Sequence, residues 1–219
     1  IRPILRGRDI KRYGYDWANL WLIATFPSRH YDIDKYPSVK QYLLSFGIER
    51  LEQTGKTHNV NGEKVKARKK TNNKWFETQD SISYWEDFFK PKIMYPNMTK
   101  YIPFYFDDKG FYQNDKSFMI TGCHVAYLTA FLNSSLFKFC FLDNFPELQG
   151  GTRELRKIFF DKIPVLEVSD EINNRFVPIL KEIQNEYTKQ KAQRIDSMLF
   201  DLYNLSSEER RTIGFVEIL

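Results

Sequence analysis

The sequence predicts an α+β protein: a mixed or antiparallel β-rich body with packed helices, followed by a C-terminal helical segment. Between residues 90 and 121, short runs rich in Ile, Phe, Tyr and Met alternate with turn signals, which is typical of strands. From residue 166 onward, apolar residues recur at helical spacing among helix formers. The composition, 42% hydrophobic and 28% charged over 219 residues, is that of a globular protein. We therefore expect an α+β body over residues 1–165 and a helical segment over residues 166–219.

Two elements are expected near the start of the chain. Residues 21–26 form a nearly continuous apolar run, which favours a buried strand. Ser38 and Gln41 have the spacing of a capping box ahead of apolar residues at helical spacing. This pattern predicts an amphipathic helix that Gly47 weakens.

A β-hairpin is expected around Asn61-Gly62, because this dipeptide lies between two alternating segments. A two-residue turn there places Val60 opposite Glu63 and Asn59 opposite Lys64. By the two-residue period of strands, one face of the ribbon then carries Thr57, Asn59, Lys64, Lys66 and Arg68. With little apolar surface to bury, the ribbon should project from the body.

Strands and then helices are expected in the second half of the chain. The strands lie within 93–95, 102–106, 111–112 and 118–121, and residues 107–110 form a turn. Helical segments follow over 124–132 and 136–142, separated by a polar break. Further helices lie beyond residue 166, and Ser206 with Glu209 forms a capping box that opens the last one.

Positive charge is concentrated in two stretches. The net charge is +5, yet residues 1–12 alone carry +4 and residues 50–74 carry +6, so the remainder sums to −5. This distribution is typical of a protein that binds nucleic acid. Two solvated loops kept basic for solubility are the alternative.

Composition disfavours several classes of protein. Two cysteines, Cys123 and Cys140, are too few for a disulfide framework or a Cys-rich zinc site. No apolar run is long enough for a transmembrane helix, so no membrane partner is expected. The chain opens without an initiator Met or an apolar leader, so we expect a piece of a longer polypeptide in a reducing cytoplasm.

No pattern of residues predicts catalysis. The three histidines lack zinc-ligand spacing, and phosphate-binding glycine loops are absent. The cofactor turn and the Asn-Pro-Pro-aromatic loop of adenine methyltransferases are absent too. Asp107-Asp108-Lys109 has the residue types of a metal-dependent nuclease, but the following Gly110 favours a plain turn. We therefore expect no catalytic residue and no metal site.

The richest candidate DNA-binding segment spans residues 64–74. Five cations in seven residues repel one another unless an anion neutralises them. Asn72 and Asn73 are suited to bidentate contacts with adenine, or serve as turn formers. The candidates in this segment are Lys64, Lys66, Arg68, Lys69, Lys70, Asn72, Asn73 and Lys74.

Other candidates lie beside glycines or at strand ends. Near Gly7, an arginine either grips phosphate or forms an internal salt bridge with Asp9. A strand gives way to a loop at Tyr95-Pro96, a suitable place for groove contacts. The glycine pair Gly150-Gly151 permits close approach of phosphate. These candidates are Arg6, Arg8, Lys92, Asn97, Lys100 and Arg153.

The order of several short strings resembles one protein family. PILRGRDIKRY stands at 3–13, followed by KWF at 74–76, FKPKIMYP at 89–96, LNS at 132–134, GGTR at 150–153 and IP at 163–164. Their succession is similar to the TaqI-like C-terminal specificity domain of type IIG restriction-modification enzymes and adenine-specific DNA methyltransferases.

This resemblance implies a non-catalytic domain that recognises a specific double-stranded DNA sequence. It also implies that methyltransferase and nuclease domains lie upstream in the same polypeptide. S-adenosylmethionine and Mg would bind there, with no cofactor in this chain. Two alternatives stay open: a separate specificity subunit that acts in trans, or a stand-alone nuclease.

The missing cofactor turn predicts that this chain alone neither binds S-adenosylmethionine nor methylates DNA. Isothermal titration calorimetry of the chain with the cofactor should show no saturable heat. Stoichiometric binding with micromolar affinity would contradict the prediction.

Overall fold

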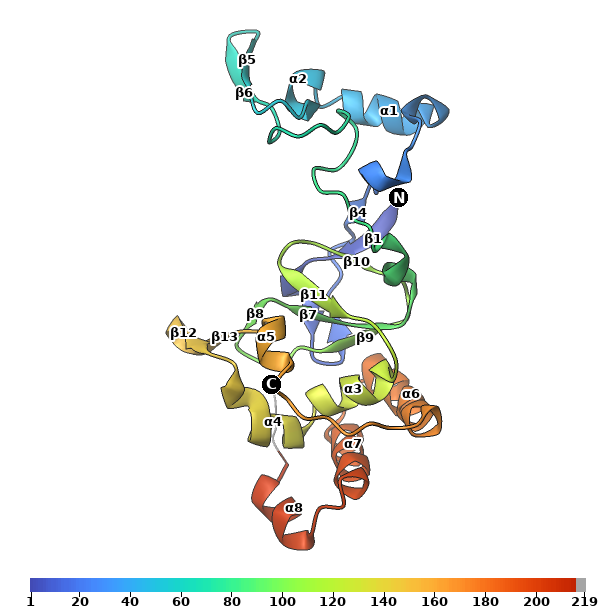
Figure 1. The fold of residues 1–219 in the computed structure, drawn as a ribbon, viewed down its shortest axis with the longest axis vertical. Helices are drawn as coiled ribbons and strands as arrows, with labels where there is room; N and C mark the ends of the chain where they lie inside the picture. The colour runs from blue at the N-terminus through green and yellow to red at the C-terminus, as the bar shows by residue number, and fades with distance from the viewer. Residues whose placement is uncertain (216–219) are drawn as a thin grey trace. The chain divides into compact units, whose positions relative to one another are not determined.

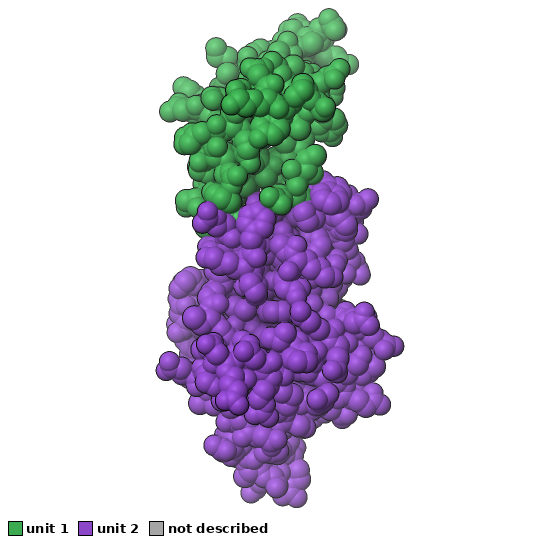
Figure 2. All heavy atoms as spheres, turned by 90° about the vertical axis from the view of Figure 1, so that its right-hand side faces the viewer, with its two compact units in different colours: residues 1–2, 22–85 green, residues 3–21, 86–219 purple. Residues whose placement is uncertain are grey.

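The computed structural model describes residues 1–215, which fold as an α+β protein with several small sheets, as the sequence predicts. The chain divides into two compact units, coloured separately in Figure 2. Unit 1 comprises Ile1–Arg2 and Leu22–Trp85, and unit 2 comprises Pro3–Trp21 and Glu86–Leu219. The main segment of unit 1, Leu22–Trp85, is therefore inserted in sequence between two parts of unit 2.

Unit 1 consists of short helices, one hairpin and long connecting loops (Figure 1). Its elements are η2 (Pro27–Arg29), η3 (Ile33–Lys35), α1 (Pro37–Leu44), α2 (Ile48–Leu51), β5 (Thr57–Val60) and β6 (Glu63–Lys66). The predicted hairpin is confirmed with its register: Asn59 pairs with Lys64, and Val60 with Glu63. Asn61 and Gly62 both have positive φ, 52° and 87°, as the tight two-residue turn requires.

Two elements expected in the first fifty residues, a helix and a strand, are present but shorter than predicted. The helix begins at Pro37, and Ser38 is not its N-cap, because a proline suits the first helical position. At Gly47 the backbone has φ 85°, so the expected helix is split into α1 and α2. The run 21–26 yields only the short strand β4 (Trp21–Leu22), and Trp21 is 55% exposed, so it is not a buried strand.

Unit 2 is built on small sheets. Its largest continuous ladder is antiparallel, with β7 (Lys92–Pro96) between β9 (Tyr105–Asp107) and β11 (Ser117–Ile120). A second sheet has the order β10 (Tyr112–Gln113), β1 (Arg2–Leu5), β4, and its β1–β10 pair is parallel. A third sheet joins β12 (Glu147–Leu148), β13 (Thr152–Glu154) and β8 (Met98–Thr99), and β2 (Ile10–Lys11) pairs with β3 (Gly14–Tyr15). The sheets are thus mixed, as expected.

The α-helices of unit 2 share a hydrophobic core with the antiparallel sheet. They are α3 (Val125–Leu132), α4 (Ser135–Phe141), α5 (Lys157–Phe160), α6 (Asp170–Asn185), α7 (Lys189–Leu202) and α8 (Ser207–Ile213). All of α3 except Leu128 is buried, and one hydrophobic cluster joins it to β7, α6 and α7. Helices beyond residue 165 therefore pack in the same compact unit as the sheets (Figure 1). The predicted capping box of α8 is confirmed, because Glu209 Oε2 accepts a hydrogen bond from the Ser206 N–H at 2.7 Å.

Within the described residues, no single helix is long and apolar enough to cross a membrane. The helix α3 and the segment Ser135–Asn144 reach that length and composition only as a pair bent by 66°.

A buried ion pair fixes the turn that follows β9. Asp107 and Lys92 are both fully buried, and the Lys92 ammonium contacts the Asp107 carboxylate and donates to the Phe88 carbonyl at 2.6 Å. The Asp107 carboxylate also accepts the main-chain N–H groups of Lys109 and Phe111, each at 3.0 Å. The predicted turn is present, but it connects two different sheets, because β9 and β10 do not pair.

Changing Asp107 to Ala should destabilise the protein by about 3 to 5 kcal/mol, because it leaves the Lys92 ammonium buried without its partner. Urea unfolding should show the loss as a lower midpoint. In the double variant Asp107→Leu/Lys92→Met, which buries no charge, part of this loss should be recovered. A single variant as stable as the wild-type protein would show that the pair does not hold the turn.

Candidate nucleic-acid interface

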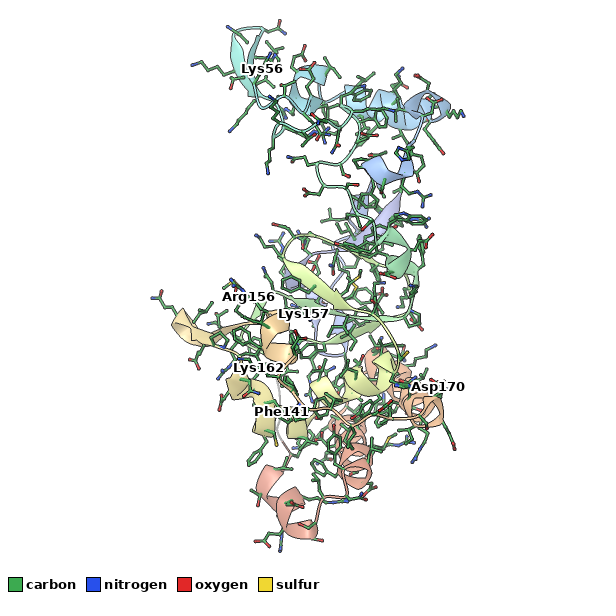
Figure 3. All side chains as sticks on the ribbon, in the orientation of Figure 1. Lys56, Phe141, Arg156, Lys157, Lys162 and Asp170 are labelled. Carbon is green, nitrogen blue, oxygen red and sulfur yellow. The ribbon has the colours of Figure 1, made fainter. Side chains whose placement is uncertain are left out.

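The residues 55–74 of unit 1 form a basic arm, made of the β5–β6 hairpin and the loop that follows it. Six of its lysines are exposed: Lys56, Lys64, Lys66, Lys69, Lys70 and Lys74. Figure 3 labels Lys56 beside the hairpin. Among the described residues, none of these six ammonium groups has a carboxylate oxygen within 4.0 Å. The arm therefore carries six ammonium groups that form no ion pair with any carboxylate of residues 1–215.

Arg68 anchors the arm and does not belong to its exposed face. Its guanidinium donates to three main-chain carbonyls, those of Leu51 at 2.8 Å, Glu77 at 2.9 Å and Trp75. Burial lowers the pKa of Arg68 below its ordinary value. The structure gives Arg68 an anchoring role in place of the expected contact with DNA, because each of its three guanidinium nitrogens donates to a carbonyl inside unit 1.

Gln53 and Asn73 complete this anchor. The buried Gln53 amide donates to the carbonyls of Lys74 at 3.0 Å and Glu77 at 2.8 Å. The Asn73 amide donates to the carbonyls of Thr78 at 3.0 Å and Gln79 at 2.9 Å. Asn73 is thus a loop-closing residue rather than a reader of bases, whereas its neighbour Asn72 is exposed.

In unit 2, the motif around Gly7 is a structural turn with one exposed arginine. The Arg6 guanidinium donates to the Asp9 carboxylate at 2.7 Å, and that carboxylate also accepts the Arg6 N–H at 2.9 Å. Burial raises the pKa of Asp9, but the hydrogen bonds from Arg6 and the nearby arginine charges outweigh it and keep the pKa below its ordinary value. A Cβ at Gly7 would clash with the Lys116 carbonyl oxygen, so this position requires glycine. Of the two alternatives, Arg6 forms the internal salt bridge, and Arg8 is left exposed.

A cleft of about 430 Å³ in unit 2 forms a second cationic surface. Arg8, Lys11, Met98 and Tyr101 are among the residues that line it, and no carboxylate of the described chain does so. Of the two cations, Lys11 lies 3.6 Å from the Asp16 carboxylate. Tyr101 is 62% exposed, the highest value among the aromatic residues of the described chain. Because Thr99 Oγ1 accepts the Tyr101 N–H at 3.0 Å and donates to the Tyr101 carbonyl at 2.8 Å, the backbone that carries this ring is held in place.

The loops around this cleft bring together several predicted residues. Pairing of β8 with β13 sets Thr99 opposite Arg153, and a Cβ at Gly150 would lie 3.9 Å from Lys100 Nζ. Lys100 is exposed and Asn97 is half-buried. The candidates predicted around Tyr95-Pro96 and those predicted around Gly150-Gly151 therefore lie close together in the fold.

The structure corrects the predicted roles of Lys92 and Arg153 as DNA-binding residues. Lys92 is fully buried against Asp107 and cannot reach a phosphate. The Arg153 guanidinium donates to the carbonyl of Phe145 at 2.6 Å and pairs with Asp143 at 2.9 Å and with Glu147 at 3.3 Å, so it ties down the preceding loop. Both side chains are used within the fold.

Three exposed residues were not among the predicted contacts. Lys56 belongs to the same basic stretch as Lys64, and this position in the sequence could have identified it as a candidate DNA contact. Lys11 was counted only in the charge of the first stretch. Tyr101 carries no sequence signal that distinguishes it from a core aromatic.

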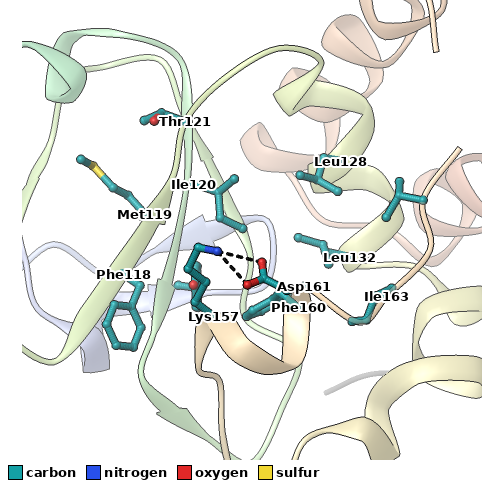
Figure 4. Close-up of a pocket in the computed structure, with 12 residues that line it drawn as sticks. Phe118, Met119, Ile120, Thr121, Leu128, Leu132, Lys157, Phe160, Asp161 and Ile163 are labelled. Atoms are coloured by element: carbon teal, nitrogen blue, oxygen red, sulfur yellow. Dashed lines mark hydrogen bonds and ion pairs between the residues drawn. The ribbon is translucent and has the colours of Figure 1, made fainter. Parts of the chain in front are cut away.

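A larger apolar pocket in unit 2 has different chemistry. About 610 Å³ lie between β11, α3 and α5, lined mainly by apolar side chains such as Phe118, Ile120 and Leu128 (Figure 4). Its one lysine, Lys157, is paired with Asp161 at 2.7 Å. This lining does not suit a polyanion. Among the described residues, no three His, Cys, Asp or Glu side chains are arranged to hold a metal ion.

The chain matches the model of a known protein family. The family model described as the TaqI-like C-terminal specificity domain covers residues 2–165, well over half of the chain. No curated protein matches the chain.

The unpaired lysines predict how binding to a duplex depends on salt. Changing Lys66 and Lys69 together to Ala should weaken binding to any duplex and flatten the slope of log affinity against log salt by roughly two units. The reason is that each phosphate contact releases about one counterion. Fluorescence anisotropy at several salt concentrations measures the slope.

The matched control is the pair Lys35→Ala and Lys90→Ala, two exposed lysines that already lie beside Asp32 and Asp87. This pair should leave the slope unchanged. Equal slopes for the arm variant and the control would show that the arm does not contact phosphates.

Proposed function

Because the chain belongs to the TaqI-like C-terminal specificity domain family, we propose that it recognises a specific sequence of double-stranded DNA for a bacterial restriction-modification enzyme. The observation that carries the proposal is the basic arm: six exposed lysines whose ammonium groups have no carboxylate partner among the described residues, on a hairpin and adjoining loop that Arg68 and Gln53 hold in place. A fixed array of unneutralised cations is the surface that a phosphate backbone requires.

Phosphate contacts position a protein on DNA, whereas contacts to base edges read the sequence. Ammonium groups on flexible stems, such as those of Lys69 and Lys70, suit the first task, since every sequence presents the same phosphates. A second set of phosphate contacts comes from Arg8, which lines the cleft of unit 2, and from the exposed Lys100 between the lining residues Thr99 and Tyr101. Asn72 is a candidate for the second task, because an exposed amide can pair with an adenine edge.

In this proposal, methyl transfer and cleavage are performed by domains covalently linked upstream. S-adenosylmethionine and Mg would bind to those domains. The chain described here contributes the choice of site, and its role is non-catalytic.

Selection from a randomised duplex library tests the proposal and requires no assumption about which bases are recognised. Bound duplexes, sequenced over successive rounds, should converge on one short motif. For that motif, log affinity should fall with log salt at a slope near −4 to −5 if about five phosphates are neutralised. Specific binding should exceed binding to a scrambled duplex by at least about a thousandfold.

The outcome that contradicts the proposal is binding without convergence, or no binding at low salt. Magnesium-dependent cleavage by the isolated chain would favour the stand-alone nuclease instead. A parallel selection with the Lys35→Ala/Lys90→Ala control should return the wild-type motif.

A further inference from the structure

The hairpin of the basic arm has two faces of different character. On one face, Thr57, Asn59, Lys64 and Lys66 are all exposed. On the other, His58, Val60 and Val65 are half-buried, and His58 Nε2 lies 3.5 Å from Glu52 Oε2 at the end of α2. The first face, here called the outer face, therefore points away from the rest of unit 1 and consists only of hydrogen-bonding side chains.

Each neutral polar residue of the outer face lies directly opposite a lysine. The register pairs Thr57 with Lys66 and Asn59 with Lys64. Residues directly opposite on two strands have Cβ atoms about 5 Å apart. The outer face is thus a compact patch in which a hydroxyl and an amide on β5 are flanked by two ammonium groups on β6.

The hairpin is also held in a fixed orientation within unit 1. Beyond the ladder, the Ala67 N–H donates to the Lys56 carbonyl at 2.9 Å and the Gly55 N–H donates to the Arg68 carbonyl at 2.8 Å. The Arg68 side chain then joins this base to Leu51 and Glu77. A ribbon anchored in this way loses little conformational entropy when it binds.

We propose that the outer face of the β5–β6 hairpin enters the major groove, where Asn59 reads an adenine and Thr57 reads a base pair about two positions away, while Lys64 and Lys66 contact phosphates. This proposal rests on the proposed function and names the residues that perform it. The major groove is about 12 Å wide and admits a two-stranded ribbon. An asparagine amide matches adenine N6 and N7 in that groove, and a threonine presents both a hydroxyl and a methyl group.

The spacing of the two readers matches the spacing of base pairs. Residues two apart on a strand are separated by roughly 6.8 Å, since the rise per residue is about 3.4 Å. Base pairs along DNA are also about 3.4 Å apart. A strand that follows the groove therefore brings Asn59 and Thr57 to positions about two base pairs apart.

The alternative reader, Asn73, is excluded because its amide is bound to two carbonyls within unit 1. Asn72 lies on a loop, whereas Asn59 lies on a paired strand. The hairpin thus serves both tasks, positioning through its lysines and reading through the strand opposite them.

The test compares the motifs selected by the wild-type chain and by Asn59→Ala, with Asn174→Ala as the control. Asn174 is an exposed asparagine on α6 of unit 2. We expect Asn59→Ala to lose its preference for adenine at one position and to bind the wild-type motif about 5- to 150-fold more weakly. Its salt slope should not change, and Thr57→Val should alter preference about two base pairs from that position.

A second measurement removes the partner atom from the DNA. Replacing the contacted adenine by 7-deazaadenine, which lacks N7, should weaken the wild-type chain and the Asn174→Ala control equally, and should leave Asn59→Ala unaffected. If Asn59→Ala selects the wild-type motif, or if 7-deazaadenine weakens every variant to the same degree, the hairpin does not read this base. In that case the proposed function stands, because the wild-type chain still selects a specific DNA motif. Failure of the wild-type chain to select any motif would overturn both.

Discussion

Buried main-chain N–H and C=O groups need hydrogen-bond partners, and in this protein side chains supply many of them. Much of the chain lies in loops between short elements, so helices and ladders do not satisfy these groups. The Arg68 guanidinium donates hydrogen bonds to three main-chain carbonyls of unit 1. In unit 2, the fully buried Asn133 amide donates to the Phe104 carbonyl at 2.8 Å and accepts the Phe104 N–H at 3.3 Å. The shape of both units depends on such contacts.

This constraint divides the basic residues into two groups. Arg6, Arg68, Lys92 and Arg153 are used inside the fold, where each meets carbonyls or a carboxylate. The lysines of the basic arm have no such partner among the described residues. Their mutual repulsion is a cost that a polyanion removes on binding. The half-buried Arg68 holds the base of the arm and thereby holds the exposed lysines in one place.

The sequence predicted the structural features that depend on residues close together in the chain. The hairpin register followed from Asn61-Gly62, and the capping box of α8 followed from Ser206 and Glu209, because each involves residues close in the chain. Ser38 had the same local signal and is not a cap, since Pro37 begins the helix first.

The division of roles among polar residues could not be predicted in this way. Asn72 and Asn73 are adjacent residues of the same type, yet only the Asn73 amide donates hydrogen bonds to the carbonyls of Thr78 and Gln79. The partner of Lys92 lies fifteen residues away on another strand, and this pairing exists only once the sheet has formed. Contacts of this kind depend on the fold. From the sequence alone, a basic residue that binds groups inside the protein therefore cannot be distinguished from one that binds a ligand.

The most direct test of this account is lysine acetylation footprinting of the chain with and without a selected duplex, read by mass spectrometry. The account predicts that DNA protects Lys56, Lys64, Lys66, Lys69 and Lys70, while Lys35, Lys90 and Lys189 react equally in both samples. Equal reactivity of the arm lysines with and without bound duplex would contradict it.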